Sequence, residues 1–391
     1  KGNIYAVPEG TVVFPGEPLL RFHGTTTEAM LLETGLSMIM NHESLIATKA
    51  RRVRTVAPRD ALMEFGLRRA QGHSAGLWGA RAAMIGGFNG TSNVEAGKRF
   101  GIPVLGTMAH SWVMSFDEEI DAFREYVRQY HDNLILLADT YNVLEMGVPH
   151  AIQVFKELKE EGRLPGKYGI RIDSGDIAYL SQEATRMFTK AGFPDAIISG
   201  SNDLDEYTIQ SLKAQGCTVT SWGVGTKIIT ADGTSALGGV FKMAVKEADG
   251  KEVPVMKFSN DVEKMTNPGI KTVYRFYKKD TGKMITDLVC LHDEKAADGG
   301  DFTLVTESAK WRRKELKAGT YTVEELLRPV VENGRSLPLP ALPEIIRYAD
   351  KQMDTLWPEY TRLLNPDLME INLSDKLQTL KSELIRRELG E

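Results

Sequence analysis

Between about residues 60 and 230 the chain repeats one pattern, a short apolar segment followed by an amphipathic stretch with helical spacing. The apolar segments are residues 83–85, 103–105, 134–137, 169–172, 196–198 and 218–221. Successive parallel strands need a long crossover, usually a helix, and this spacing provides room for one. With one further unit around residues 64–69, the pattern predicts an α/β fold, an irregular TIM-like barrel that is closed or nearly closed. A doubly wound open sheet is the alternative.

A polar or Gly-rich tip follows each apolar segment. The tips are residues 89–93, 107–110, 139–142, 173–176, 199–203 and 223–227. In an α/β barrel the carboxyl ends of all strands lie on one face, and active sites are built there. We therefore expect the side chains of these tips to form one site.

The flanking segments have a different character. Short β-forming runs with Pro and Gly punctuation, and hairpin signals such as Asp249-Gly250, predict mostly antiparallel strands. The predicted domains are residues 1–26 (part of a β domain), 27–237 (barrel with the active site), 238–320 (the rest of the β domain, sharing a sheet with 1–26) and 321–391 (C-terminal helical region). Helical spacing predicts helices over 322–332, 342–364 and 374–389, the last with Ser374 as its N-cap.

Composition excludes several classes of protein. A net charge of −5 argues against a nucleic-acid-binding protein, and no apolar run is long enough to span a membrane. The two cysteines, Cys217 and Cys290, give neither a metal-binding spacing nor a disulfide framework, which favours a cytoplasmic protein. We expect no secretory leader, and because the chain starts at Lys1 on a strand-like segment, we also expect it to be a piece of a longer protein.

The tips carry residues suited to an anionic ligand. The Gly-rich tips at 199–203 and 223–226 suit phosphate binding through backbone N–H groups, although they could serve only as tight turns. Phe65 beside Arg68 suits stacking of a flat ring and binding of phosphate oxygens. Arg171 and Asp173 lie on one side of a strand, where they could hold a carboxylate and sugar hydroxyls or Mg²⁺, or form a structural ion pair.

His110 and Asp139 complete the candidate set. His110 could be a base, an acid, a metal ligand, a phosphoryl acceptor or a hydrogen-bonded structural histidine, and Asp139 could join a metal site. The chain has no GxGxxG, GxxxxGK[ST], HExxH or G-x-S-x-G motif, which argues against a Rossmann cofactor, a P-loop, zinc and a serine nucleophile. The residues alone thus predict an α/β-barrel enzyme that acts on a phosphorylated, anionic small molecule.

Six motifs then occur in a characteristic order: EFGLRRAQG, GGFNGTSNVEAG, GIPVLGTMAHSWVMSF, IRIDSGD, SGSNDLDEY and WGVGT. Together they closely resemble the nicotinate phosphoribosyltransferase family, a type II phosphoribosyltransferase family, over almost the whole chain. The resemblance implies formation of nicotinate mononucleotide and pyrophosphate from nicotinate and phosphoribosyl pyrophosphate, with Mg²⁺ and with coupled hydrolysis of ATP. It also implies a cytoplasmic homodimer with sites near the subunit interface.

The resemblance assigns roles to individual residues. It implies that His110 is a phosphohistidine, that Asp173 is catalytic, and that Asp173 and Asp139 are candidate magnesium ligands. Substrate-binding positions are implied for Phe65, Arg68, Ser92, Thr107, Arg171, Gly200, Gly223, Gly225 and Thr226. Within this set, Thr107 and Arg171 match positions that contact nicotinate.

Ser92 bears on the choice of substrate. Nicotinamide-using relatives carry an aspartate there, which accepts a hydrogen bond from an amide but repels a carboxylate, so Ser92 favours nicotinate. The alternatives are a nicotinamide or quinolinate phosphoribosyltransferase, a non-catalytic ligand-binding relative, or another phosphosugar enzyme such as an isomerase or aldolase. Family members also begin earlier and use an aromatic residue of that earlier segment to cover the pyridine ring in a neighbouring subunit.

Overall fold

The computed structural model describes residues 1–259, 265–296, 300–305 and 313–390. The chain forms two compact units, one of residues Asn41–Leu237 and one of Lys1–Met40 together with Gly238–Glu391. Helix α1 (Thr26–Val56) contributes residues to both units. None of the described helices is long and apolar enough to cross a membrane.

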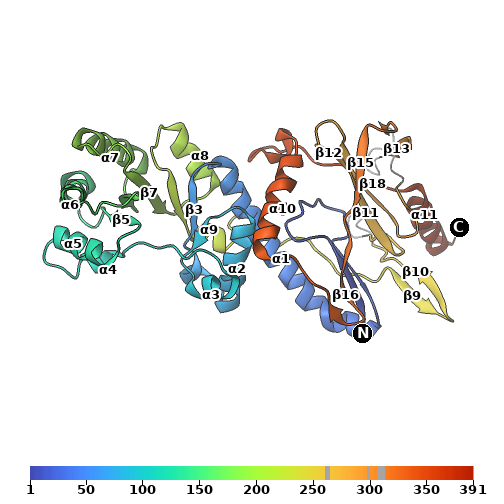
Figure 1. Cartoon of the computed structure of the whole chain (residues 1–391). Coiled ribbons are helices and arrows are strands. Elements are labelled where there is room, and N and C mark those ends of the chain that lie inside the picture. The colour runs from blue at the N-terminus through green and yellow to red at the C-terminus, as the bar shows by residue number, and fades with distance from the viewer. Residues whose placement is uncertain (260–264, 297–299, 306–312, 391) are drawn as a thin grey trace. The chain divides into compact units, whose positions relative to one another are not determined.

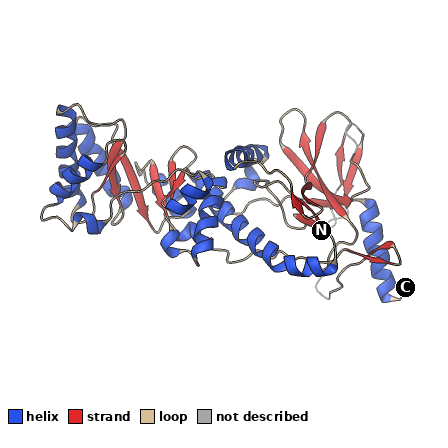
Figure 2. Ribbon diagram, turned by 60° about the horizontal axis from the view of Figure 1, so that its bottom comes forward, coloured by secondary structure: helices blue, strands red, loops and turns tan. Residues whose placement is uncertain are grey.

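The unit of residues 41–237 is built on a six-stranded parallel sheet with the strand order β4-β3-β8-β7-β6-β5. Its strands are β3 (Ala61–Glu64), β4 (Gly90–Thr91), β5 (Leu134–Leu137), β6 (Tyr168–Ile172), β7 (Ile197–Asn202) and β8 (Ser221–Val224). All four residues of β5 are buried, as expected for a parallel strand covered on both faces. Figure 2 shows these strands side by side with helices packed around them.

The predicted α/β class is confirmed, but the sheet is a curled half-barrel. Among the described residues β4 and β5 are its two edges, and the predicted strand at 103–105 forms only a single bridge, between Thr91 and Val104. Pro103 has no N–H to donate and Gly106 follows directly, and both residues disfavour a longer strand. The predicted strand at 83–85 is wrong, since these buried residues end helix α2 (His73–Ile85).

Helices follow the strands and begin at their tips. They are α3 (Val94–Phe100), α4 (His110–Val113), α5 (Glu119–Gln129), α6 (Val148–Glu160), α7 (Ile177–Ala191), α8 (Glu206–Ala214) and α9 (Thr226–Ile229). Two short helical turns, Leu67–Arg69 and Val143–Gly147, lie between them. The side chains of Asn93, Asp176 and Asp205 cap α3, α7 and α8 by accepting a hydrogen bond from a backbone N–H of the first turn. Figure 1 shows α5, α6 and α7 stacked beside β5 and β7.

The other unit contains mostly antiparallel sheets, in which only the described pairing of β12 with β18 is parallel. One has the order β17-β16-β1-β2, and another has the order β15-β11-β12-β18. The bounds are β1 (Asn3–Ala6), β2 (Leu20–His23), β11 (Lys271–Lys278), β12 (Met284–Leu291), β15 (Tyr321–Glu325), β16 (Arg328–Glu332), β17 (Arg335–Ser336) and β18 (Ile371–Leu373). Two hairpins, β9 (Val245–Ala248) with β10 (Lys251–Pro254) and β13 (Phe302–Val305) with β14 (Arg313–Leu316), complete this unit.

The structure differs here from the sequence-based prediction. The predicted helix over 322–332 is wrong, because this segment forms β15 and β16, where Pro329 would interrupt a helix. The expected sheet between residues 1–26 and 238–320 is also absent from the described pairings, since β1 pairs with β16 and β2. The hairpin signal is confirmed: Asp249 and Gly250 join β9 to β10 with φ angles of 51° and 71°.

The C-terminal helices follow the prediction closely. Helix α10 (Leu342–Thr355) ends earlier than predicted, and a 3₁₀ turn, Pro358–Thr361, follows it. Helix α11 (Asp375–Leu389) is capped as expected by Ser374, whose hydroxyl accepts a hydrogen bond from the N–H of Leu377.

Candidate functional site

Arg171, near the carboxyl end of β6, organises one cluster of predicted residues. Its Nη1 donates to Oγ1 of Thr107 at 2.8 Å, and its Nε donates to Oγ of Ser201 at 2.7 Å. Its Nη2 donates to Oδ1 of Asp173, also at 2.7 Å. The guanidinium thus joins the ends of β6 and β7 to the loop before α4.

Asp173 is held as a carboxylate. Burial of Asp173 opposes its ionisation, but hydrogen bonds from Ser201 and Arg171, together with the charges of Arg171 and His110, outweigh burial and lower its pKa. A negative charge is therefore fixed beside the guanidinium at neutral pH. The sequence-based interpretation of Arg171 and Asp173 as neighbours on one side of the strand agrees with this geometry.

His110 and Asp139 form a second pair within the same cluster. Nε2 of His110 lies 3.2 Å from Oδ1 of Asp139. The other oxygen of Asp139 accepts hydrogen bonds from the backbone N of Asp173 at 3.1 Å and from Oγ of Ser174 at 2.5 Å. The Asp139 side chain is 1% exposed and that of His110 is 41% exposed, so the carboxylate is buried while the imidazole remains accessible.

The partner of the imidazole determines its tautomer. A carboxylate oxygen only accepts hydrogen bonds, so Nε2 of His110 is the nitrogen that carries the proton toward Asp139. In the neutral ring Nδ1 then holds the lone pair. His110 is the first residue of α4.

Phe65 and the glycines after β8 form the other cluster. A Cβ added to Gly223 would lie 2.7 Å from Cδ2 of Phe65 and 3.3 Å from Cβ of Ser201, and one added to Gly225 would lie 3.0 Å from the carbonyl oxygen of Phe65. Gly223 therefore lies against both the Phe65 ring and Ser201, so the two clusters adjoin and this position requires glycine.

The remaining predicted residues lie around these two clusters. Ser92 follows β4, and its N–H donates to the carbonyl of Glu64 at 3.0 Å. Thr226 begins the short helix α9, and Arg68 is exposed in the turn Leu67–Arg69. Gly200 lies instead against the side chains of Val219 and Trp222, which a Cβ at this position would contact. The absence of a side chain at Gly200 therefore makes room for these two residues.

The magnesium prediction can be tested against the donors present. Among the described residues, no group of three or more His, Cys, Asp or Glu is arranged to hold a metal ion. Mg²⁺ in phosphate-handling sites needs only one or two carboxylates, because water and substrate phosphates complete its shell. Asp139 uses both oxygens within the protein, whereas the described side-chain hydrogen bonds of Asp173 all go to Oδ1. The donor set fits such an ion at Asp173 and fits it less well at Asp139.

Sequence reasoning missed two of the side chains that complete the first cluster. Ser201 bonds both Arg171 and Asp173, and Ser174 bonds Asp139. Both residues lie in tips that the sequence singled out, but attention there went to glycines and charged residues. The alternation of a strand places Ser201 two residues after Ser199 on the inner face, and this signal could have found it.

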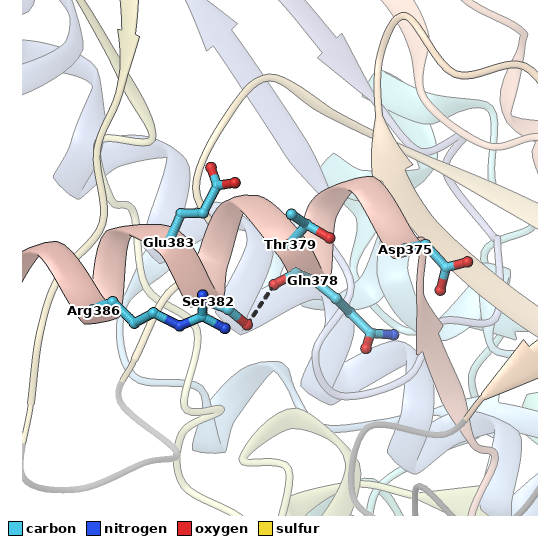
Figure 3. A pocket seen from close by; sticks show the side chains of 6 residues that line it. All are labelled: Asp375, Gln378, Thr379, Ser382, Glu383 and Arg386. Carbon is cyan, nitrogen blue, oxygen red and sulfur yellow. Dashed lines mark hydrogen bonds between the residues drawn. The ribbon is translucent and has the colours of Figure 1, made fainter. Parts of the chain in front are cut away.

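A depression of about 330 Å³ lies elsewhere, along one face of α11 (Figure 3). Six polar or charged side chains of that helix line it: Asp375, Gln378, Thr379, Ser382, Glu383 and Arg386. None of the predicted site residues is among them. Its lining contains no apolar side chain to bury a ligand, so it is not the candidate site.

Known proteins are similar to this chain in sequence and in fold. The sequence model of the nicotinate phosphoribosyltransferase (NAPRTase) family matches residues 61–295, and that of the nicotinate phosphoribosyltransferase C-terminal domain matches residues 270–381. Nicotinate phosphoribosyltransferase of Bacillus subtilis (strain 168) is 41% identical over 382 residues, covering 97% of this chain and 77% of the relative.

Solved structures agree with the sequence matches. A crystal structure of human nicotinic acid phosphoribosyltransferase superposes with a TM-score of 0.85 and 30% identity, covering 98% of this chain and 82% of the human chain. Nicotinate-nucleotide pyrophosphorylase from Pyrococcus furiosus, with a TM-score of 0.70, 24% identity and coverage of 90% and 81%, shares the fold. On the matches to the family model and to the Bacillus subtilis enzyme, the chain belongs to the nicotinate phosphoribosyltransferase family.

Proposed function

We propose that this chain forms nicotinate mononucleotide and pyrophosphate from nicotinate and phosphoribosyl pyrophosphate, with ATP as a co-substrate hydrolysed through a phosphohistidine at His110. The observation that carries the proposal is the Arg171 cluster, in a chain 41% identical to an enzyme named nicotinate phosphoribosyltransferase. Arg171 has five N–H donors, and its three described side-chain hydrogen bonds use three of them. Two remain for a substrate carboxylate.

The nicotinate pocket combines these donors with a flat surface. Arg171 binds the carboxylate with Thr107 beside it, and the half-buried ring of Phe65 stacks on the pyridine. Ser92 has a neutral hydroxyl, so it adds no charge that would repel this carboxylate. These features favour nicotinate over nicotinamide. Quinolinate, with two carboxylates, would need cations beyond Arg171.

The phosphoribosyl group lies at the other cluster in this proposal. The backbone around Gly223, Gly225 and Thr226, with Arg68 nearby, binds the 5′-phosphate, because glycines let the chain approach the oxygens closely. Gly200 contributes only backbone atoms there. The carboxylate of Asp173 stabilises the positive charge that develops on the ribose as pyrophosphate leaves. A magnesium ion held at Asp173 would neutralise charge on the leaving pyrophosphate.

The ATP step uses the His110–Asp139 pair. Nδ1 of His110 attacks the γ-phosphorus, a nitrogen–phosphorus bond forms, and the bond to the ADP oxygen breaks. The proton stays on Nε2, which donates it to Asp139 in a hydrogen bond, and the carboxylate stabilises the charged ring. A phosphorylated His110 adds a charge of about −1.5 to −2 beside the site, by analogy with other phosphorylated side chains. This charge favours the state that binds substrate.

The same proposal includes the setting of the enzyme. We infer a cytoplasmic homodimer with sites near the subunit interface, and no nucleic acid or membrane partner. The free cysteines, Cys217 and Cys290, support the cytoplasm, and the net charge of −5 argues against a nucleic-acid partner. Light scattering on the purified protein tests the dimer, and a monomer at working concentration would remove that part of the proposal.

One assay tests the reaction. Mononucleotide formation is measured with nicotinate, nicotinamide and quinolinate in parallel, each with and without ATP. We expect turnover with nicotinate, stimulated by ATP, and little with the other two. Preference for nicotinamide would overturn the argument from Ser92, and a protein that binds nicotinate without turnover would be a non-catalytic relative.

A further inference from the structure

Glu64, the last residue of β3, is a fully buried carboxylate next to the site, and it takes no part in the proposed reaction. One of its oxygens accepts a hydrogen bond from the backbone N–H of Gly66, and the other accepts one from Oγ1 of Thr91 at 2.5 Å. No ion pair to Glu64 exists within the described residues. Burial raises its pKa, and the hydrogen bonds from Thr91 and Gly66 act in the opposite direction.

The position of Glu64 in the sheet explains these contacts. In the parallel register it stands beside Thr91 of β4 and Val224 of β8, and its side chain bonds Thr91. A Cβ on Gly66 would lie 2.7 Å from Oε1 of Glu64. The carboxylate therefore fills the space under the turn that follows Phe65.

The Thr91 hydroxyl continues the network around Ser92. It donates to Glu64 and accepts a hydrogen bond from the backbone N of Asn93 at 3.0 Å. The N–H of Ser92 donates to the main-chain carbonyl of Glu64 at 3.0 Å. The main-chain carbonyl of Glu64 thus holds Ser92. Its carboxylate holds the Thr91 hydroxyl, which in turn holds the N–H of Asn93, and also holds the turn after Phe65.

We propose that Glu64 is a positioning residue whose carboxylate fixes Ser92 and Phe65 relative to each other, and so sets affinity and selectivity for the pyridine substrate. The proposal rests on the proposed function, in which these two residues contact the pyridine. A carboxylate suits the place because both of its oxygens face donors. An amide would turn an NH₂ group toward one of them.

Substitutions on both sides of the bond test this role. Glu64→Gln and Thr91→Val each remove an accepting or donating partner with little change in volume, and Thr91→Ser keeps the hydroxyl. We expect the first two to raise KM for nicotinate about tenfold, with kcat changed by less than about threefold, as the loss of one buried hydrogen bond predicts. The ratio of nicotinate to nicotinamide turnover should fall alongside. Thr91→Ser should behave like the wild type.

The double variant gives a second readout. If the two residues act through one hydrogen bond, the double variant Glu64→Gln with Thr91→Val should have a KM for nicotinate no higher than that of the more affected single variant. Glu206→Gln is the matched control, because Glu206 is a buried carboxylate outside the site, paired with Lys49 and Arg52. It should lower the melting temperature without changing KM.

The outcomes separate the two proposals. Unchanged KM and unchanged selectivity in Glu64→Gln and Thr91→Val, whatever their melting temperatures, would reduce Glu64 to a purely structural residue. If Glu64→Gln does not fold, Thr91→Val and Thr91→Ser decide the question between them. Failure of the wild-type protein to convert nicotinate would instead refute the proposed function, and KM would then be compared for the base that it does use.

Discussion

Oδ1 of Asp139 lies 3.2 Å from Nε2 of His110, while Oδ2 of the same carboxylate accepts a hydrogen bond from the backbone N of Asp173 at 3.1 Å. A single buried side chain therefore contacts both the proposed phosphoryl acceptor and the segment that carries the proposed catalytic carboxylate. The roles of His110 and of its neighbours in the site can be tested separately.

Replacing His110 by Ala should abolish stimulation by ATP and leave some ATP-independent transfer, because Nδ1 is the only atom of this residue placed to accept the phosphoryl group. The measurement is the initial rate with and without ATP, together with incorporation of label from γ-labelled ATP. His131→Ala, which removes an exposed histidine, serves as the control. Stimulation that survives in His110→Ala would disprove the phosphohistidine.

Replacing Arg171 by Lys should raise KM for nicotinate about tenfold or more, because an ammonium cannot reproduce the planar fork that bonds Thr107, Ser201 and Asp173. Steady-state kinetics at saturating phosphoribosyl pyrophosphate measure the change. Arg163→Lys, at an exposed ion pair, is the matched control. A variant with wild-type KM would show that the carboxylate binds elsewhere.

Replacing Ser92 by Asp should shift the preference from nicotinate toward nicotinamide by at least about tenfold, because the new carboxylate repels one base and accepts a hydrogen bond from the other. The ratio of kcat/KM for the two bases reports the shift. Ser92→Ala should leave that ratio nearly unchanged. A Ser92→Asp enzyme that keeps the wild-type ratio would place this residue outside the pocket.

Replacing Gly223 by Ala should reduce kcat/KM about tenfold, because the new Cβ would lie 2.7 Å from the Phe65 ring and would displace it. The substitution Gly166→Ala is the control, since a Cβ there meets no atom within 4 Å. Kinetics with varied nicotinate and varied phosphoribosyl pyrophosphate show which substrate is affected. Equal activity in the two variants would contradict the assigned packing.

Replacing Glu17 by Gln should stabilise the unit of residues 1–40 and 238–391 at alkaline pH. Burial, and then the neighbouring Asp287, raise the pKa of Glu17 to about 10 despite Arg275. A raised pKa means that the folded state binds the proton more tightly, so this contribution to stability is complete below the unfolded pKa and is lost as pH rises toward 10. We expect a gain in the free energy of unfolding that is small near pH 5 and grows as the pH rises toward 10.

Denaturant unfolding at several pH values measures this gain. Glu332→Gln, at an exposed position, controls for the loss of one negative charge. A gain in stability that is independent of pH would show that the effect of Glu17 does not come from its ionisation.

Local patterns were sufficient to predict much of the parallel sheet. The segments at 134–137 and 169–172 are short, apolar and followed by polar tips, and both are strands. The segment at 83–85 is equally apolar but ends a helix, because so short a run does not distinguish helix from strand. Residues 322–332 form strands because they pair with residues far away in the chain, including β1 and β11, which no local pattern reveals.

In the candidate site, too, local sequence patterns identify some residues, and only the structure reveals others. Thr107, Arg171 and Asp173 could be identified because charged or hydroxyl side chains follow predicted strands, and the structure brings them into one hydrogen-bonded group. Glu64 could not be identified in this way. A glutamate at the end of a strand is ordinary in a sequence, and only its burial and its bond to Thr91, 27 residues away, distinguish it.

Because Asp139 contacts both His110 and the backbone of Asp173, it links the proposed ATP reaction to the phosphoribosyl transfer. When the ring of His110 gains or loses a phosphoryl group, the charge next to Oδ1 of Asp139 changes. The other oxygen, Oδ2, accepts a hydrogen bond from the main chain of Asp173. Under the proposed mechanism, a single carboxyl group transmits the change between unphosphorylated and phosphorylated His110 to the residues that contact the ribose. The linkage between the two reactions is then only a few bonds long.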